Sequence, residues 1–243
     1  MQIKIEHRPS YALGIVDLEA DEQVKAETGA MVSMTTNLRV ESSMQGGFLK
    51  SAMRSMLGGE SFFVNTFTAQ GGPGQISFAP SLPGDITTVT VGGELFVQSG
   101  SYLASEMGID IETKWGGATS FFSSEGLFLL NLKGSGQTLI SSFGAIHKMT
   151  LDGTNDIIID TGHVVAFEPT VQWKVKKVAG FVTSLMSGEG LVCEFSGAGD
   201  VWLQTRSNQA FLDWLVPRLP TAHTSSGGRG GIGGILGNVL GGR

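Results

Sequence analysis

Cysteine is nearly absent from the chain, whose 243 residues include only Cys193. A single cysteine excludes an internal disulfide framework and is typical of a reducing compartment. Cys193 alternates with Leu191 and Phe195 in a strand-like run, so we expect it to pack as a small apolar side chain. No cationic residue stands close to it in the sequence, and a reactive thiol is therefore not expected.

Clustered positive charge is also lacking. The chain has 16 Lys and Arg against 22 Asp and Glu, a formal net charge of −6, whereas proteins that bind a phosphate backbone usually carry a concentrated positive field. The one local basic cluster, Lys174, Lys176 and Lys177, divides over the two faces of a strand, as in an ordinary solvated strand. Nucleic acid is therefore not the expected partner.

Long hydrophobic runs do not occur. The longest uncharged apolar stretches fall well short of the roughly 20 residues that span a bilayer. The N-terminal segment MQIKIEHRPSYALG lacks the charged-then-apolar layout of a signal peptide. These patterns predict a cytoplasmic protein, whose contact with a membrane, if any, is peripheral.

Catalytic and metal-binding motifs are missing as well. There is no GxSxG elbow, and GSGQT carries no P-loop lysine. His163 and Asp160 share the segment IDTGHVV, but a metal site needs three or four convergent ligands, and the paired-histidine spacing is absent. The sequence thus predicts a protein that is not an enzyme and has no cofactor and no metal ion.

Glycine, in contrast, is abundant, and it punctuates an internal repeat. The 36 glycines and the short runs of Val, Thr and Phe suit tight turns between strands. Three segments of the pattern glutamate, apolar run, glycine turn and apolar run contain Glu60, Glu125 and Glu189, which are 65 and 64 residues apart. A period of about 64 residues indicates three copies of one structural unit.

A second anchor accompanies each glutamate. Gly29, Gly100 and Gly162 each begin a small apolar strand, 31, 25 and 27 residues before the matching glutamate. Short strands without intervening helical patterns favour antiparallel packing over βαβ units. We therefore expect an all-β fold of three tandem pseudo-repeats, about 1–80, 81–142 and 143–207, each a double-layered antiparallel unit of six or seven strands, arranged around a pseudo-threefold axis.

The C-terminal part has a different composition. SNQAFLDWLVPRL predicts one helix over 208–219, with Ser207 as N-cap, Pro217 near its end, and Phe211, Leu212, Trp214 and Leu215 docking it. It completes a single body over 1–220. Residues 221–243 form a glycine-rich tail that we expect to be flexible, and whose spaced apolar residues suit self-association or capture of a partner.

Several segments together resemble a known family. They are GGESFF, PGDI at Pro83, FVQSGSYLAS, SSEGLFLL, SFGAIHKMTL, IDTGHVVAFE, GEGLVCEFSGAGDVWLQTRS and the glycine-rich tail. The chain resembles bacterial members of the altered-inheritance-of-mitochondria family from about Gly29 to Ser207. This resemblance implies a fold similar to the tryptophan RNA-binding attenuator protein, no established catalytic residue, and, for mitochondrial members, an association with the integrity of inner-membrane complexes.

The candidate interaction residues precede the three glutamates. Each repeat has an apolar segment at the same place, and the first of them reads as a short amphipathic helix. We expect these segments either to form one exposed apolar surface or to close the ends of the barrel. Their candidate interaction residues are Phe48, Leu49, Met53, Met56 and Leu57 in the first, Phe121 and Phe122 in the second, and Phe181, Leu185 and Met186 in the third.

The glutamates themselves have two interpretations. Glu60, Glu125 and Glu189 form a carboxylate cluster for acid–base work only if all three face the pseudo-axis. The favoured interpretation is structural, because a carboxylate at a strand start accepts hydrogen bonds from the backbone N–H groups of a tight turn.

The function expected from these patterns is that of a non-enzymatic interaction or scaffold protein. It either self-associates or docks to a protein partner or a membrane surface, through the apolar segments and the tail. The alternative is a small-ligand binding module that uses clefts between repeats.

Overall fold

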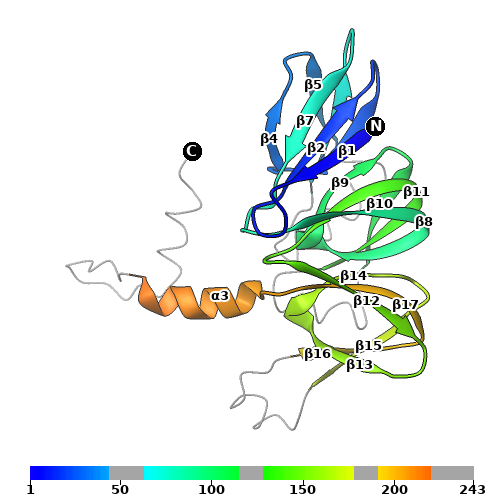
Figure 1. The fold of residues 1–243 in the computed structure, drawn as a ribbon, viewed down its shortest axis with the longest axis vertical. Helices are drawn as coiled ribbons and strands as arrows, with labels where there is room; N and C mark the ends of the chain where they lie inside the picture. Colours follow the sequence, from blue (N-terminus) through cyan, green and yellow to red (C-terminus); the bar gives the residue numbers. More distant parts are fainter. Residues whose placement is uncertain (44–62, 115–127, 178–190, 220–243) are drawn as a thin grey trace. The chain divides into compact units, whose positions relative to one another are not determined.

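The computed structural model describes residues 1–43, 63–114, 128–177 and 191–219. The chain divides into two compact units, Met1–Gln209 and Ala210–Arg243. Strands of the first unit pair in an antiparallel manner throughout, and one α-helix follows them among the described residues (Figure 1). The expected all-β fold with one C-terminal helix is therefore confirmed.

The strands fall into three groups along the chain. The first strand group contains β1 (Gln2–Glu6), β2 (Leu13–Leu18), β3 (Gln23–Glu27), β4 (Met31–Met34), β5 (Leu38–Ser43), β6 (Val64–Ala69) and β7 (Gly74–Phe78). The second contains β8 (Ile86–Gln98), the 3₁₀ turn η1 (Ser99–Ser101), β9 (Tyr102–Glu106), β10 (Ile109–Lys114) and β11 (Leu129–Ser141). The third contains β12 (Ile146–Asp152), β13 (Ile157–Asp160), η3 (Thr161–His163), β14 (Val164–Phe167), β15 (Gln172–Lys177), β16 (Leu191–Ser196) and β17 (Ala198–Gln204).

One pairing pattern occurs in all three groups. In the first, β7 lies between β2 and β4, and β6 lies between β3 and β5. In the third, β17 lies between β12 and β14, and β16 between β13 and β15. In the second, the long strand β11 takes both central places and pairs with β8 along its whole length. On its other side, the first half of β11 pairs with β10 and the second half pairs with β9.

Neighbouring groups are joined by strand pairing. β3 of the first group pairs with β9 of the second, and β8 of the second group pairs with β14 of the third. In both cases the strand before the glycine anchor of one group meets the strand after the glycine anchor of the next. The backbone ladder that results is the central part of a ten-stranded sheet.

The apolar core also crosses the group boundaries. Leu103 and Ala104 of β9 belong to the core cluster of the first group, beside Val16, Val24 and Ile76. Val165 and Ala166 of β14 belong likewise to the core cluster of the second group. Each inner strand that follows a glycine anchor thus completes the core of the preceding group, and burial of these side chains drives the contact between groups.

A second link between groups is made by their entry loops. The N–H of Ala12 donates to the carbonyl of Gly84 at 2.9 Å, and the N–H of Asp85 donates to the carbonyl of Gly144 at 2.9 Å. Arg8 Nε and Nη2 donate to the two carboxylate oxygens of Asp85 at 2.7 and 2.9 Å. A Cβ atom on Gly84 would lie 1.6 Å from the carbonyl oxygen of Ser142, so glycine is required for this close approach.

The C-terminal helix α3 spans Asn208–Leu215 and continues as the 3₁₀ turn η4 (Val216–Arg218). No side chain of the helix is buried, and the docking of this helix through Phe211, Leu212, Trp214 and Leu215 stays a prediction. From Ala210 onward the chain forms a separate compact unit. Arg218 lies over the Trp214 ring at 4.9 Å and donates to the Trp214 carbonyl.

Candidate interaction surface

The interaction residues predicted from the sequence lie outside the described residues. These are Phe48, Leu49, Met53, Met56, Leu57, Phe121, Phe122, Phe181, Leu185 and Met186, together with the glutamates Glu60, Glu125 and Glu189. Their exposure and their roles stay predictions. The described residues present a different candidate surface, which is made of two strand edges.

The first edge is the outer side of β4. This strand pairs with β7 on one side, and none of the described strands pairs with it on the other. All four of its residues are exposed, including Met31, Val32 and Met34. The matching strands β9 and β14 are almost wholly buried. The difference follows from position, because β9 and β14 each have a neighbouring group and β4 has none.

The second edge is the outer side of β13. It pairs with β16 alone among the strands that the structure describes. Ile158, at its centre, leaves 66% of its surface exposed. Its counterparts four residues before the other glycine anchors, Lys25 and Phe96, both reach into the next group. Ile158 is thus an exposed apolar side chain on an unpaired strand, where natural sheets often carry a charged residue.

The counterparts of Ile158 show what this position does. Lys25 is buried, and its Nζ donates across the group boundary to the carbonyl of Met107 at 3.4 Å and to that of Ile109. Burial lowers the pKa of this Lys25 ammonium group. Phe96 packs on Phe167 of the third group with 5.2 Å between ring centroids. The position thus supplies a side chain that bridges to the following group.

The counterparts of Val32 are equally informative. Val32, Leu103 and Val165 each stand three residues after a glycine anchor, and each is skipped by a β-bulge in the pairing with β7, β11 or β17. Leu103 and Val165 are 1% and 0% exposed, whereas Val32 is 58% exposed. The same bulge therefore sets the direction of this side chain in all three groups. Leu103 and Val165 pack in the core of the preceding group, whereas Val32 has no preceding group.

An apolar hollow of about 480 Å³ lies beside β13. Its lining comes from Met149, Ile157, Ile158, Ile159, Asp160, His163, Leu203 and Gln204. Three of these residues have counterparts in the first group, found from the distance to the glycine anchor and from the strand registers. The counterparts are Val16 for Met149, Val24 for Ile157 and Phe78 for Leu203. Those three residues belong to the core cluster that contains Leu103. The hollow in the third group therefore lies at the place that corresponds to the one occupied by the Leu103 side chain in the first group.

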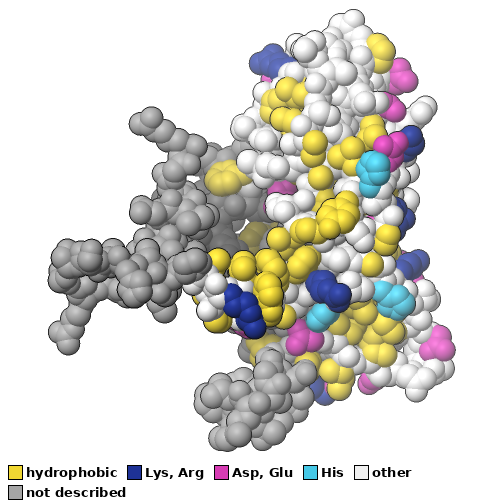
Figure 2. Space-filling model, turned by 60° about the vertical axis from the view of Figure 1, so that its left-hand side comes forward, with side chains coloured by type: hydrophobic (Ala, Val, Ile, Leu, Met, Phe, Trp, Pro, Cys, Tyr) yellow, Lys and Arg dark blue, Asp and Glu magenta, His cyan; other side chains and the backbone are white. Residues whose placement is uncertain are grey.

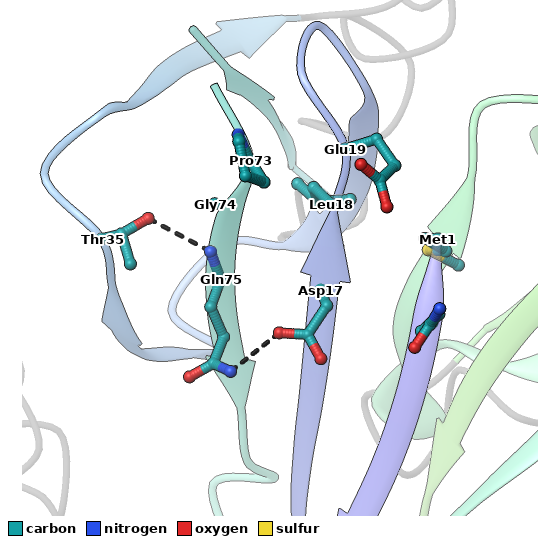
Figure 3. Close-up of a pocket in the computed structure, with 9 residues that line it drawn as sticks. Met1, Asp17, Leu18, Glu19, Thr35, Pro73, Gly74 and Gln75 are labelled. Carbon is teal, nitrogen blue, oxygen red and sulfur yellow. Dashed lines mark hydrogen bonds between the residues drawn. The ribbon is translucent and has the colours of Figure 1, made fainter. Parts of the chain in front are cut away.

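A second hollow, of about 580 Å³, lies within the first group (Figure 3). Gln75 spans part of it: its N–H donates to Thr35 Oγ1 at 3.1 Å, and its Nε2 donates to Asp17 at 2.8 Å. Each of the two hollows is lined by residues of one strand group. The sequence-based ligand hypothesis, in contrast, places its site in clefts between repeats.

Neither a metal-binding cluster nor a membrane-spanning helix occurs among the described residues. Within the described ranges no group of three or more His, Cys, Asp or Glu side chains is placed to hold a metal ion. Over the same part of the chain, no helix has the length and apolarity to cross a membrane. Figure 2 shows hydrophobic side chains at the surface among charged side chains of both signs.

These features define a class of antiparallel all-β protein in which strand groups are joined edge to edge. The chain belongs to the mitochondrial biogenesis AIM24 family, whose model matches residues 3–206. This match confirms the family resemblance noted in the sequence. The likeness to the tryptophan RNA-binding attenuator protein stays a prediction.

Two bacterial relatives agree with this assignment. An uncharacterised protein of Streptococcus pyogenes serotype M6 is 32% identical over 231 residues, which are 91% of this chain and 92% of the relative. An X-ray crystal structure of a Streptococcus pyogenes protein superimposes with a TM-score of 0.76 at 29% identity, and covers 90% of this chain and 99% of that one. These similarities extend over the three strand groups.

Sequence reasoning missed the residues at the two edges. These edges include four exposed apolar residues, namely Met31, Val32, Met34 and Ile158. Such residues read as ordinary core residues because they lie in short apolar runs typical of buried strands. The signal was available in the repeat itself. In a row of units joined edge to edge, the first and last units each keep one unpaired edge.

Proposed function

We propose that this protein is a non-enzymatic scaffold that acts by binding other protein chains at its sheet edges. The observation that supports the proposal is the pair of unpaired edges β4 and β13, with exposed Val32 and Ile158. Unpaired backbone N–H and C=O groups along such edges favour addition of a strand from another chain, and the apolar side chains add affinity.

The residues of the two edges are mostly not of the kinds that keep other edges unpaired. Natural sheets protect free edges with charged side chains, proline or covering loops. β4 reads Met-Val-Ser-Met, and the first three residues of β13 are isoleucine. The fourth residue of β13 is Asp160, so its edge is apolar over three of four positions. Mainly apolar edges of this kind are suited to contact with another chain.

The test is a comparison of complex sizes in the cells that make the protein. Val32→Lys and Ile158→Lys each place a charge on one edge, and Tyr11→Lys, at a residue that is 74% exposed in a loop, is the matched control. On native gels we expect the wild type and the control in complexes larger than one chain, and both edge variants in smaller species. If the wild type runs as a single chain, the proposal is wrong.

A small-ligand binding module is the second candidate, and the hollow beside β13 favours it. Its lining combines isoleucine and leucine side chains with the polar groups of Asp160 and His163, a mixture typical of ligand sites. A thermal-shift screen of the purified protein against metabolites tests this candidate, because a ligand that binds the native state raises the melting temperature. Ile159→Trp, which fills the hollow, should abolish any shift.

A further inference from the structure

We infer that β4 of one copy of this chain pairs with β13 of a second copy, and that Val32 then fills the hollow beside β13. This inference rests on the proposed function and names the partner as the chain itself. Both halves of the contact already exist within the molecule, since it uses the same kind of contact twice between its own strand groups.

The two internal contacts share one register. Four residues before the anchor, Lys25 lies opposite Ser105, and Phe96 lies opposite Phe167. The opposed residue is in both cases the fifth after the next anchor. The neighbouring pairs, Ala26 with Ala104 and Val97 with Ala166, keep the same offset.

The same offset applied to the free edges gives a definite register. Ile158 of one copy lies opposite Met34 of the other, and Ile159 lies opposite Ser33. Ile158 and Met34 are 66% and 38% exposed in the single chain, so pairing would bury both. Aligned in this way, β13 and β4 repeat the geometry of β8 with β14.

The side chains agree with this register. Leu103 packs in the core cluster of the first group, and Val165 packs in the core cluster of the second group. In the third group the corresponding volume is the hollow lined by Met149, Ile157, Ile159 and Leu203. Val32 is the one residue at this position that is exposed, and its bulged strand is built as β9 and β14 are. A protruding valine and a mainly apolar hollow thus occupy matching places on the two edges.

The contact is heterologous, because it joins two different edges. Each copy offers one β4 and one β13, so copies add head to tail, and they form a closed ring if the rotation between copies divides a full turn, or a filament if it does not. The strand ladder that runs through the three groups of one chain would then continue into the next.

Disulfide trapping tests the register directly. Residues directly opposed in antiparallel strands have Cα atoms about 4.5 to 5.5 Å apart, within disulfide range. Purified Met34→Cys chains are mixed with purified Ile158→Cys chains and oxidised, and the products are separated on non-reducing gels. We expect a disulfide-linked dimer in the mixture, and linked chains of increasing length from the variant that carries both substitutions.

Controls separate this register from chance contact. Met31→Cys lies on the same exposed strand but about 10 Å further along, so its mixture with Ile158→Cys should not crosslink. The wild type, whose only cysteine is the buried Cys193, should stay unlinked. Adding Val32→Lys to the Met34→Cys chain should abolish the crosslink.

Three results would overturn the inference. They are the absence of any crosslink at all concentrations, a crosslink of equal yield from Met31→Cys, and closure of the disulfide within single chains of the doubly substituted variant. If one of these occurs while Val32→Lys and Ile158→Lys still reduce the complexes seen in cells, the scaffold function stands with a different partner. If the cell complexes are also unchanged, both proposals are wrong.

Discussion

At the scale of single residues, Glu27 is the group with the clearest electrostatic consequence. It ends β3, and burial raises the pKa of its carboxyl group from 4.5 to about 7. The second group has Gln98 at the corresponding position, two residues before the glycine anchor. The third group has Asp160 there, whose carboxylate accepts a hydrogen bond from the N–H of Gly162 at 2.9 Å. The uncharged Gln98 shows that the second group accommodates a neutral side chain of similar size at this place.

The raised pKa of Glu27 predicts that the stability of the protein depends on pH. Folded Glu27 retains its proton up to about pH 7, so its contribution to stability is complete below pH 4.5 and decreases as pH rises from 4.5 to 7. Glu27→Gln should be as stable as the wild type below pH 4.5, and more stable above pH 7 by up to about 3 kcal/mol. Urea unfolding at pH 4 and pH 8 checks this. Equal stability of the two proteins at pH 8 would show that Glu27 is not desolvated.

Gly84 gives a second prediction at this scale. Gly84→Ala places a Cβ against the carbonyl of Ser142 and disrupts the loop that joins the groups, so we expect a loss of about 2 kcal/mol or more in unfolding free energy. Gly72→Ala is the control, because nothing lies within 4 Å of its added Cβ. Urea midpoints compare the two variants, and similar midpoints would contradict the steric argument.

At the scale of elements, equivalent strands differ in what they contribute to the single chain. β9 and β14 fill the core of a preceding group, and β4 does not. The pattern of apolar residues after the glycine anchors predicts strands at all three places. It does not tell a buried strand from an exposed one, because Val32, Leu103 and Val165 are all typical core residues.

Matched truncations should reveal this difference. Leu103→Ala leaves a cavity in the first core and should lower the unfolding free energy by about 3 kcal/mol. Val32→Ala, on the equivalent strand, should change it by less than about 0.5 kcal/mol in dilute solution. Urea unfolding of dilute single chains measures both. A large effect of Val32→Ala would mean that β4 is packed within the single chain.

At the scale of the whole molecule, the strand groups follow one another through edge pairing, and the two edges that would continue this pairing, β4 and β13, are unpaired among the described strands. The inferred contact between copies is apolar, since it brings together Val32, Met34 and Ile158. It should therefore depend on protein concentration and little on salt.

Light scattering checks this expectation. The average mass should rise with protein concentration, and should be nearly the same in 0.1 M and about 1 M NaCl, where exposed charges are screened beyond about 3 Å. Dissociation by salt would point instead to ion pairs and would contradict an apolar contact.

The all-β class, the C-terminal helix and the family can be predicted from the sequence without the structure. These follow from local and periodic signals, namely glycine turns, short apolar runs and the spacing of Gly29, Gly100 and Gly162. Only the tertiary structure decided which strands remain unpaired. Exposure of Val32 and Ile158 depends on whether a strand of another group pairs with theirs, as in the distant pairs Lys25–Ser105 and Phe96–Phe167. No local pattern records the neighbours that a strand lacks.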